Sequence, residues 1–154
     1  MDESAQDPTR LDSPPPPKAA PTAARRLQIF MAFDYGLKRT GVASGNILTR
    51  TASPQATIAA EGTARFPLIQ ARIQAWQPDA LVVGIPFHPD GASHDNTVRA
   101  QKFARQLRGR FGLPVFEVDE RYSTTEALAG GAKDADAASA CIILEQFLRS
   151  LPHE

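Results

Sequence analysis

A short apolar run at residues 27–33 is the feature of this sequence that most constrains its fold. Six of these seven residues are apolar, and Asp34 follows them directly. A strand of this composition has both faces covered, as the central strand of a layered α/β domain does. A second run, at residues 80–85, predicts another buried strand, of the parallel type. Two such strands in one chain require helices on both sides of the sheet.

The pattern around these runs alternates between strand and helix periodicity. Gly36 allows a tight turn, so residues 40–44 predict a strand forming a hairpin with the first, and a weak third strand follows around residues 55–58. Helical spacing predicts a helix ending at Trp76, one from 95 or 96 to 111, and one from 134 or 136 to 151. A strand is predicted at 115–118, and a capping box at 123–126 predicts a short helix. This order predicts an α/β fold, a mixed sheet of a hairpin or meander followed by parallel strands and flanked by helices.

The chain of 154 residues, 42% of them apolar, is long enough for one domain. Residues 1–26 contain four consecutive prolines and few large apolar residues, so we expect a disordered tail before a domain at 27–154. Seventeen basic residues balance seventeen acidic ones, so net charge does not indicate a nucleic-acid partner. The single cysteine, Cys141, lies in an apolar run and excludes a disulfide framework. With no membrane span or secretory leader evident, we expect a cytoplasmic protein with no membrane partner.

Three acidic residues lie where a predicted strand or helix begins or ends. Asp34 ends the first strand, Glu120 follows the strand at 115–118, and Asp136 opens the last helix. Open α/β sheets place their sites at such positions. Asp136 shares a helix face with the apolar stripe that packs on the sheet, so the three carboxylates converge if the strands carrying Asp34 and Glu120 are neighbours.

Each acid also has a purely structural interpretation. Asp136 is well placed for a helix N-cap, Asp34 for a turn residue, and Glu120 for a surface ion pair with Arg121. Convergence of all three would instead indicate a cation between them, because clustered carboxylates repel. Oxygen ligands of this kind suit Mg²⁺ or Mn²⁺, which could support phosphodiester cleavage. The loop with His88, Asp90 and His94 could also hold metal, although we interpret its histidines as solvated.

Basic residues supply candidate phosphate contacts. Residues 96–125 carry six basic and three acidic residues, and Arg99, Lys102 and Arg105 can share one helix flank. This flank is either a solvated helix face or a phosphate-binding patch. Lys38 and Arg39 follow Asp34 in the hairpin turn and are better placed beside a metal. The candidate substrate-binding residues are therefore Lys38, Arg39, Arg99, Lys102 and Arg121.

Taken together, these segments resemble the YqgF family, also called RuvX. The matching pieces are residues 33–36 with Lys38, then 41–43, 82–86, 90–91, 99–100, 103–104, 119–121, 123–124 and 136–140. They occur in order from residue 29 to about 148, and so cover nearly the whole predicted domain. The joint occurrence of these motifs is specific, although none of them is decisive alone.

The resemblance implies an RNase H-like fold with Asp34, Glu120 and Asp136 as metal-binding catalytic acids. It implies a nuclease, a hydrolase acting on ester bonds, that processes the 5′ end of pre-16S rRNA on ribosomal precursor particles. Junction resolution on branched DNA is an older assignment for the family, for which a homodimer would suit the two-fold symmetry and a monomer remains open. The segment at 127–135 is shorter than the loop usual in the family, which bears on substrate choice.

Two other functions are compatible with parts of the sequence. An actin- or Hsp70-like ATPase also has a strand, an Asp-x-Gly turn and a hairpin, but it needs two such domains and this chain has room for one. A non-catalytic RNA-binding ribosome-assembly factor would keep the fold and tolerate loss of Asp34 or Glu120.

Overall fold

The computed structural model describes residues 27–88, 90–92, 95–120 and 135–151. Its elements follow the predicted order, with strands at β1 (Ile29–Tyr35), β2 (Thr40–Asn46), β3 (Thr51–Ile58), β4 (Ala80–Ile85) and β5 (Val115–Asp119). The helices are α1 (Arg65–Trp76), which a 3₁₀ turn at Gly62–Ala64 precedes, α2 (Asp95–Phe111) and α4 (Ala135–Ser150). The predicted tail at 1–26 and the capping-box helix at 123–126 lie outside the described residues.

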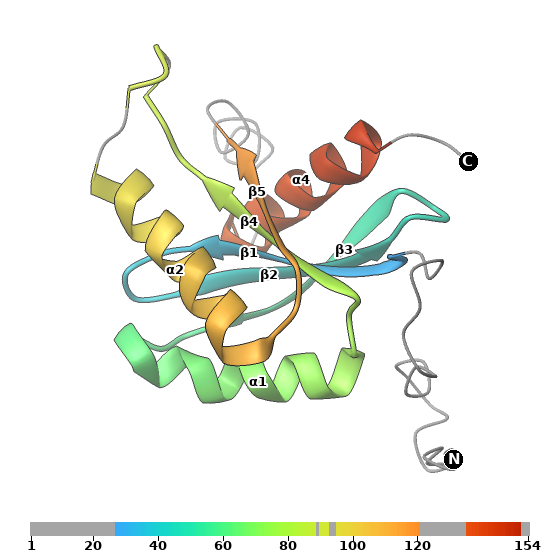
Figure 1. Cartoon of the computed structure of the whole chain (residues 1–154), viewed down its shortest axis with the longest axis horizontal. Coiled ribbons are helices and arrows are strands. Elements are labelled where there is room, and N and C mark those ends of the chain that lie inside the picture. Colours follow the sequence, from blue (N-terminus) through green and yellow to red (C-terminus); the bar gives the residue numbers. More distant parts are fainter. Residues whose placement is uncertain (1–26, 89, 93–94, 121–134, 152–154) are drawn as a thin grey trace.

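The strands form a mixed sheet in the order β3-β2-β1-β4-β5. The first three strands are antiparallel neighbours, and β4 and β5 continue the sheet in parallel with β1. Figure 1 shows α1 and α2 on one face of this sheet and α4 on the other. The predicted fold class, an RNase H-like meander followed by parallel strands and flanked by helices, is therefore confirmed.

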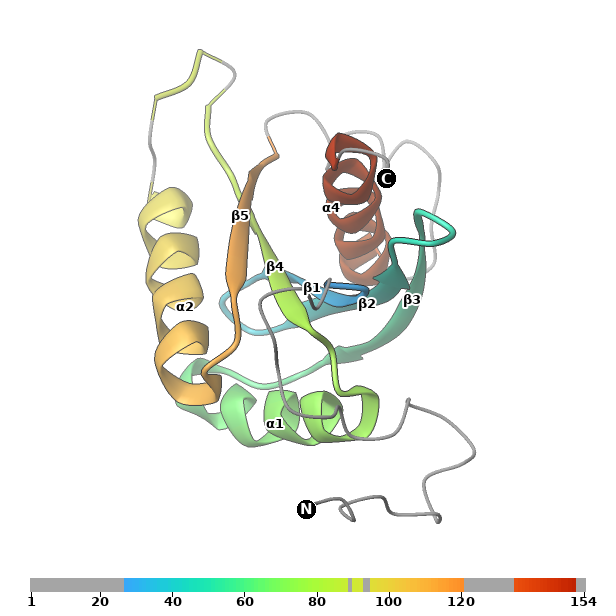
Figure 2. The ribbon, with the colours of Figure 1, turned by 45° about the vertical axis from the view of Figure 1, so that its right-hand side comes forward.

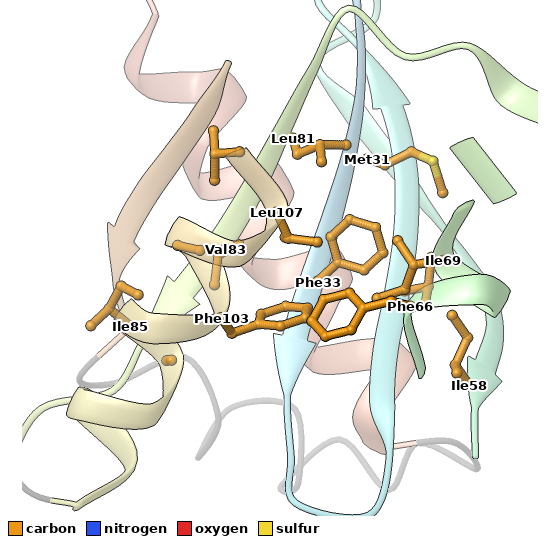
Figure 3. Packing of buried hydrophobic residues seen from close by; sticks show 14 residues of the cluster. Met31, Phe33, Ile58, Phe66, Ile69, Leu81, Val83, Ile85, Phe103 and Leu107 are labelled. Carbon is orange, nitrogen blue, oxygen red and sulfur yellow. The ribbon is translucent and has the colours of Figure 1, made fainter. Parts of the chain in front are cut away.

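Two apolar clusters hold the helices on the sheet, one on each face. Under α1 and α2, Phe33, Phe66 and Phe103 pack with aliphatic residues of β1, β4 and both helices (Figure 3). On the other face, the stripe of α4 packs against Phe30, Ala32 and Val82. Successive residues of β1 alternate between the clusters, as the period of a strand covered on both faces requires. Burial of these side chains is the main favourable contribution to folding.

Both ends of β1 differ from the prediction, and β2 and β5 extend to Asn46 and Asp119. β1 extends to Tyr35 because the hairpin pairs Asp34 with Gly41 and Tyr35 with Thr40. Its start moves to Ile29, where the Asp79 carboxylate accepts hydrogen bonds of 2.8 Å from the backbone N–H groups of Gln28 and Ile29.

β3 is twice as long as the stretch predicted at 55–58 and begins at Thr51. It is an edge strand whose residues are mostly exposed, so the sequence has little apolar alternation there to mark it. Pro54 is tolerated at this edge, because one side of an edge strand does not have to donate hydrogen bonds. Pro67 likewise lies in the first turn of α1, where backbone N–H groups have no partner within the helix.

Candidate active site

The three acids predicted from the sequence lie on the α4 side of the sheet, toward the ends of the parallel strands. Asp34 alternates with Phe33, which faces the α1–α2 side, so its carboxylate faces α4. Glu120 directly follows β5, and its backbone N–H donates to the carbonyl of Ile85 at 3.2 Å. Asp136 is the second residue of α4. Figure 2 shows α4 on the side of the strands opposite α2.

Gly84 in β4 makes room for the Glu120 side chain. A Cβ at this position would lie 2.8 Å from Oε2 of Glu120 and 2.4 Å from Cδ1 of Ile143. Distances this short do not occur for real Cβ atoms, so any larger residue would displace the carboxylate or the helix. The absence of a side chain at Gly84 therefore sets how deeply Glu120 enters the sheet face.

Gly41 in β2 makes room for the backbone at the start of α4. A Cβ there would lie 2.0 Å from the backbone oxygen of Asp136. The first turn of α4 thus rests directly on the strand backbone, opposite Asp34 in the hairpin register. This contact brings Asp136 close to Asp34.

Burial and mutual repulsion shift the pKa of Asp34. Desolvation, and next the charge of Asp136, raise the pKa of Asp34 to about 7, against a smaller lowering by a hydrogen bond from the Ser139 hydroxyl. Ser139 is itself buried, one turn after Asp136 on the same helix. Asp34 therefore has a second acid and a hydroxyl donor from α4 around its carboxylate.

Glu120 is the most deeply enclosed of the three. Its side chain is 7% exposed, and Oε2 is buried without a hydrogen-bond partner. Burial, followed by the charges of Asp34 and Asp119, raises the pKa of Glu120 to about 8. A buried carboxylate oxygen without a partner is unfavourable, so this arrangement suits a site at which a cation or a proton resides.

Asp136 is engaged differently, because Nε of Arg39 lies 3.0 Å from its Oδ2 in an ion pair. Arg39 is 65% exposed, so this pair is solvent-screened. Within the described residues, no three His, Cys, Asp or Glu side chains form a ready-made metal cluster. Mg²⁺, however, commonly takes one or two protein carboxylates and completes its shell with water and substrate phosphate. The neighbouring carboxylates of Asp34 and Glu120, with the unpartnered Oε2, fit such an ion, and Asp136 is the third available ligand.

The predicted basic residues fall into two groups. Lys38 and Arg39 are exposed in the β1–β2 turn beside Asp34. Arg99 and Lys102 are exposed on α2, across the sheet from α4, so the fold does not place them among the carboxylates. Arg121 and His94 lie outside the described residues.

Several residues of the site were missed at the sequence level. Ser139 could have been found, because it lies three residues after Asp136 on the face that packs on the sheet. Gly41 and Gly84 carry no local signal, since only the packed structure shows what approaches them. Cys141 is half-buried with the pKa of its thiol raised to about 11, chiefly by desolvation, in keeping with the inert role expected of it.

A family model described as "RuvX: Holliday junction resolvase" matches residues 28–150, a range that contains the whole described sheet and all three acids. The chain belongs to the RuvX family. The match confirms the resemblance drawn from the motifs, and it does not favour the ATPase alternative.

Curated relatives of this RuvX-family chain agree with the assignment. A protein of Polaromonas sp. (strain JS666) named "Putative pre-16S rRNA nuclease" is 79% identical over 134 residues, covering 87% of this chain and 97% of its own. Proteins with the same name from Albidiferax ferrireducens and Burkholderia thailandensis are 72% and 50% identical, over 83% and 86% of this chain and 82% and 95% of their own lengths.

Among solved structures, Thermus thermophilus RuvC in complex with a Holliday junction substrate is similar with a TM-score of 0.49 and 18% identity, covering 80% of this chain and 94% of its own. This similarity is too low to bear on function. In the part of the chain that the structure describes, no helix is both long and apolar enough to cross a bilayer.

Proposed function

We propose that this chain is a divalent-metal-dependent nuclease that hydrolyses phosphodiester bonds in structured RNA. Its substrate is the 5′ end of pre-16S rRNA, met in the cytoplasm on ribosomal precursor particles. The observation that carries the proposal is the unpartnered, buried Oε2 of Glu120 beside Asp34, within a family described as resolvases and among relatives named for rRNA processing. The enzyme class is a hydrolase acting on ester bonds.

Each residue of the site has a distinct part in this proposal. Asp34, Glu120 and Asp136 hold the metal, which can be Mg²⁺ or Mn²⁺. When bound, it supplies the activation of water and the stabilisation of the leaving oxygen that phosphodiester hydrolysis needs. Ser139 orients the Asp34 carboxylate by its hydrogen bond.

The remaining residues act on the substrate. Lys38 and Arg39 contact phosphate beside the carboxylates, where their exposed side chains can move to meet it. Arg99 and Lys102 contact the nucleic-acid backbone from α2, away from the carboxylates, and Arg121 is the further predicted phosphate contact. Contacts of this kind bind without reading sequence and weaken as salt rises.

Cleavage of end-labelled pre-16S rRNA leader tests the proposal, with and without Mg²⁺ or Mn²⁺, in parent and Asp34→Asn. We expect metal-dependent products that the variant loses while it binds RNA nearly as well, because the substitution removes a ligand and not the basic surface. Glu117→Gln is the matched control. Glu117 lies on β5, the strand that leads to Glu120, and forms a partly exposed ion pair with Arg108 of α2. Equal cleavage by Asp34→Asn and parent would refute the proposed role.

Branched DNA is the second candidate substrate, because the family description names Holliday junction resolution. A four-way DNA junction assayed in parallel decides between the two, and a preference for it would also make a homodimer the expected state. Binding of RNA without cleavage of either substrate would indicate a non-catalytic assembly factor instead.

A further inference from the structure

A buried guanidinium lies beneath the turn that follows Asp34. Arg65, the first residue of α1, is 1% exposed and is among the largest fully buried side chains of the described chain. Its Nη1 donates to the carbonyl of Gly36 at 2.8 Å and to Oγ1 of Thr40 at 2.9 Å, and its Nη2 donates to the carbonyl of Leu37 at 2.9 Å. Three of its hydrogen bonds thus end on the β1–β2 turn, and a fourth, from Nε, ends on Gly62 at 2.9 Å.

Aromatic rings complete the enclosure of Arg65. The guanidinium carbon lies 4.4 Å from the ring centroid of Tyr35 and 5.9 Å from that of Phe103. Desolvation lowers the pKa of Arg65 from its ordinary value, so its burial opposes the charge. An apolar residue would fill this space without that penalty. The distinctive contribution of the arginine is its planar fork, which fixes two consecutive carbonyls of the turn at once.

The turn that Arg65 holds carries the basic residues nearest the carboxylates. Leu37, Lys38 and Arg39 are exposed at its tip, and Arg39 reaches from there to Asp136. Because the carbonyls of Gly36 and Leu37 are fixed from below, the side chains that follow them leave the turn in a set direction. The position of Arg65 therefore bears on where two phosphate-binding side chains stand relative to Asp34.

We propose that Arg65 is a positioning residue that holds the Gly36–Arg39 turn so that Lys38 and Arg39 meet a substrate phosphate beside the carboxylates. The claim that Lys38 and Arg39 meet a substrate phosphate rests on the proposed function. The claim that Arg65 fixes the conformation of the turn does not. Arg65 contacts no substrate in this proposal and acts only through the turn.

Limited trypsin digestion tests the hold on the turn without any nucleic acid. Trypsin cleaves after Lys38 and Arg39, and the rate reports how often the turn opens. In Arg65→Met we expect cleavage at these two sites to be about tenfold faster, because charge-assisted hydrogen bonds to the turn are lost. Arg110→Met is the matched control, because Arg110 lies in the last turn of α2, where its guanidinium lies 4.0 Å from the Phe66 ring centroid. Unchanged cleavage in folded Arg65→Met would overturn the proposal.

Equilibrium binding of pre-16S leader RNA tests the positioning role. We expect Arg65→Met to weaken binding about tenfold and to flatten the salt dependence by about one phosphate contact or more. In a background of Lys38→Ala and Arg39→Ala, the same substitution should have almost no further effect on Kd, because it acts through those two side chains. A merely structural arginine would instead weaken binding equally in both backgrounds, which would refute the proposal.

Arg65→Lys keeps the positive charge but loses the planar guanidinium, and it is the variant to test if Arg65→Met does not fold. It should fall between parent and Arg65→Met in both measurements, and identity with the parent would overturn the role of the fork. A parent that neither binds nor cleaves RNA would refute the proposed function, and with it the phosphate part of this inference. A parent that binds RNA while Arg65 variants bind equally well would refute the inference alone.

Discussion

The backbone oxygen of Asp136 lies within 2.0 Å of the point where Gly41 would carry a Cβ. The first turn of α4 therefore rests on β2 with nothing between the two backbones. This contact sets the height of Asp136 above the sheet and its proximity to Asp34. A substitution at Gly41 should therefore shift the position of Asp136 while all three acidic residues are kept.

Gly41→Ala should lower stability by about 1–3 kcal/mol, the usual effect of overpacking a filled core, and should abolish most metal-dependent cleavage. The start of α4 must move to admit the methyl group, and Asp136 moves with it. Gly109→Ala is the control, because a Cβ there meets nothing within 4 Å and the residue lies inside α2. It should stabilise the protein by about 0.5–1 kcal/mol. Thermal or denaturant unfolding with a cleavage assay measures both, and wild-type activity in Gly41→Ala would contradict this account.

Gly84→Ala tests whether the space beside Gly84 positions the Glu120 carboxylate for metal binding. The added Cβ would lie 2.8 Å from Oε2 of Glu120, so the carboxylate must swing away from Asp34. We expect metal affinity, measured by calorimetry with Mn²⁺, to fall about tenfold or more, in the range seen when supporting groups of a metal site are altered. Retained affinity in a folded Gly84→Ala protein would show that Glu120 is not a ligand.

The metal-free protein should lose stability as pH rises through neutrality. Folding raises the pKa of Asp34 to about 7 and that of Glu120 to about 8, so the folded state binds these protons more tightly than the unfolded state does. Their contribution is fully present below the unfolded pKa values, near 4, and is lost as pH rises through about 7 and 8. Denaturant unfolding between pH 5 and pH 9 measures the decline in free energy.

Two additions should reverse this loss at the alkaline end. Mg²⁺ at saturating concentration should restore stability, because it binds the ionised carboxylates of the folded state alone. Glu120→Gln should stabilise the metal-free protein at alkaline pH by about 1–3 kcal/mol, since it removes a buried charge. Glu117→Gln should not do so. A flat pH profile in the metal-free parent would show that the two carboxylates are not desolvated as described.

Ser139→Ala should weaken metal binding most at mildly acidic pH. The Ser139 hydroxyl lowers the pKa of Asp34 by donating to its carboxylate, so its removal raises that pKa further and favours the protonated form. The apparent Mn²⁺ affinity, followed against pH, should shift its midpoint upward by a fraction of a unit. Ser150→Ala is the control, because the Ser150 hydroxyl donates to the Phe147 carbonyl at the far end of the same helix. An unshifted profile would remove Ser139 from the site.

The order and type of the described elements could be predicted from the sequence because each has a local periodic signal. The apolar run before Asp34 indicates a strand covered on both faces, and the stripe from Ala140 to Phe147 indicates the helix face that packs on it. β3 could not be delimited in this way, because an exposed edge strand needs no apolar alternation.

The candidate acids were found from sequence because strand ends and helix starts are readable in one dimension. Their convergence was predicted on the condition that the strands carrying Asp34 and Glu120 are neighbours, and this condition is not met, because β4 lies between β1 and β5. The carboxylates still come together, because Gly84 of β4 leaves room for the Glu120 side chain and α4 lies over β1 and β2. Gly41 and Gly84 fall within the family motifs, but the sequence did not show what approaches them, and Arg65 carried no signal. What they do depends on contacts between segments distant along the chain, and an arginine opening a helix is ordinarily a solvated residue. The sequence by itself determined which elements form and which carboxylates are available, since these follow from local periodicity. Only the tertiary structure decided how closely the carboxylates meet, because close packing between backbones distant along the chain sets their separation.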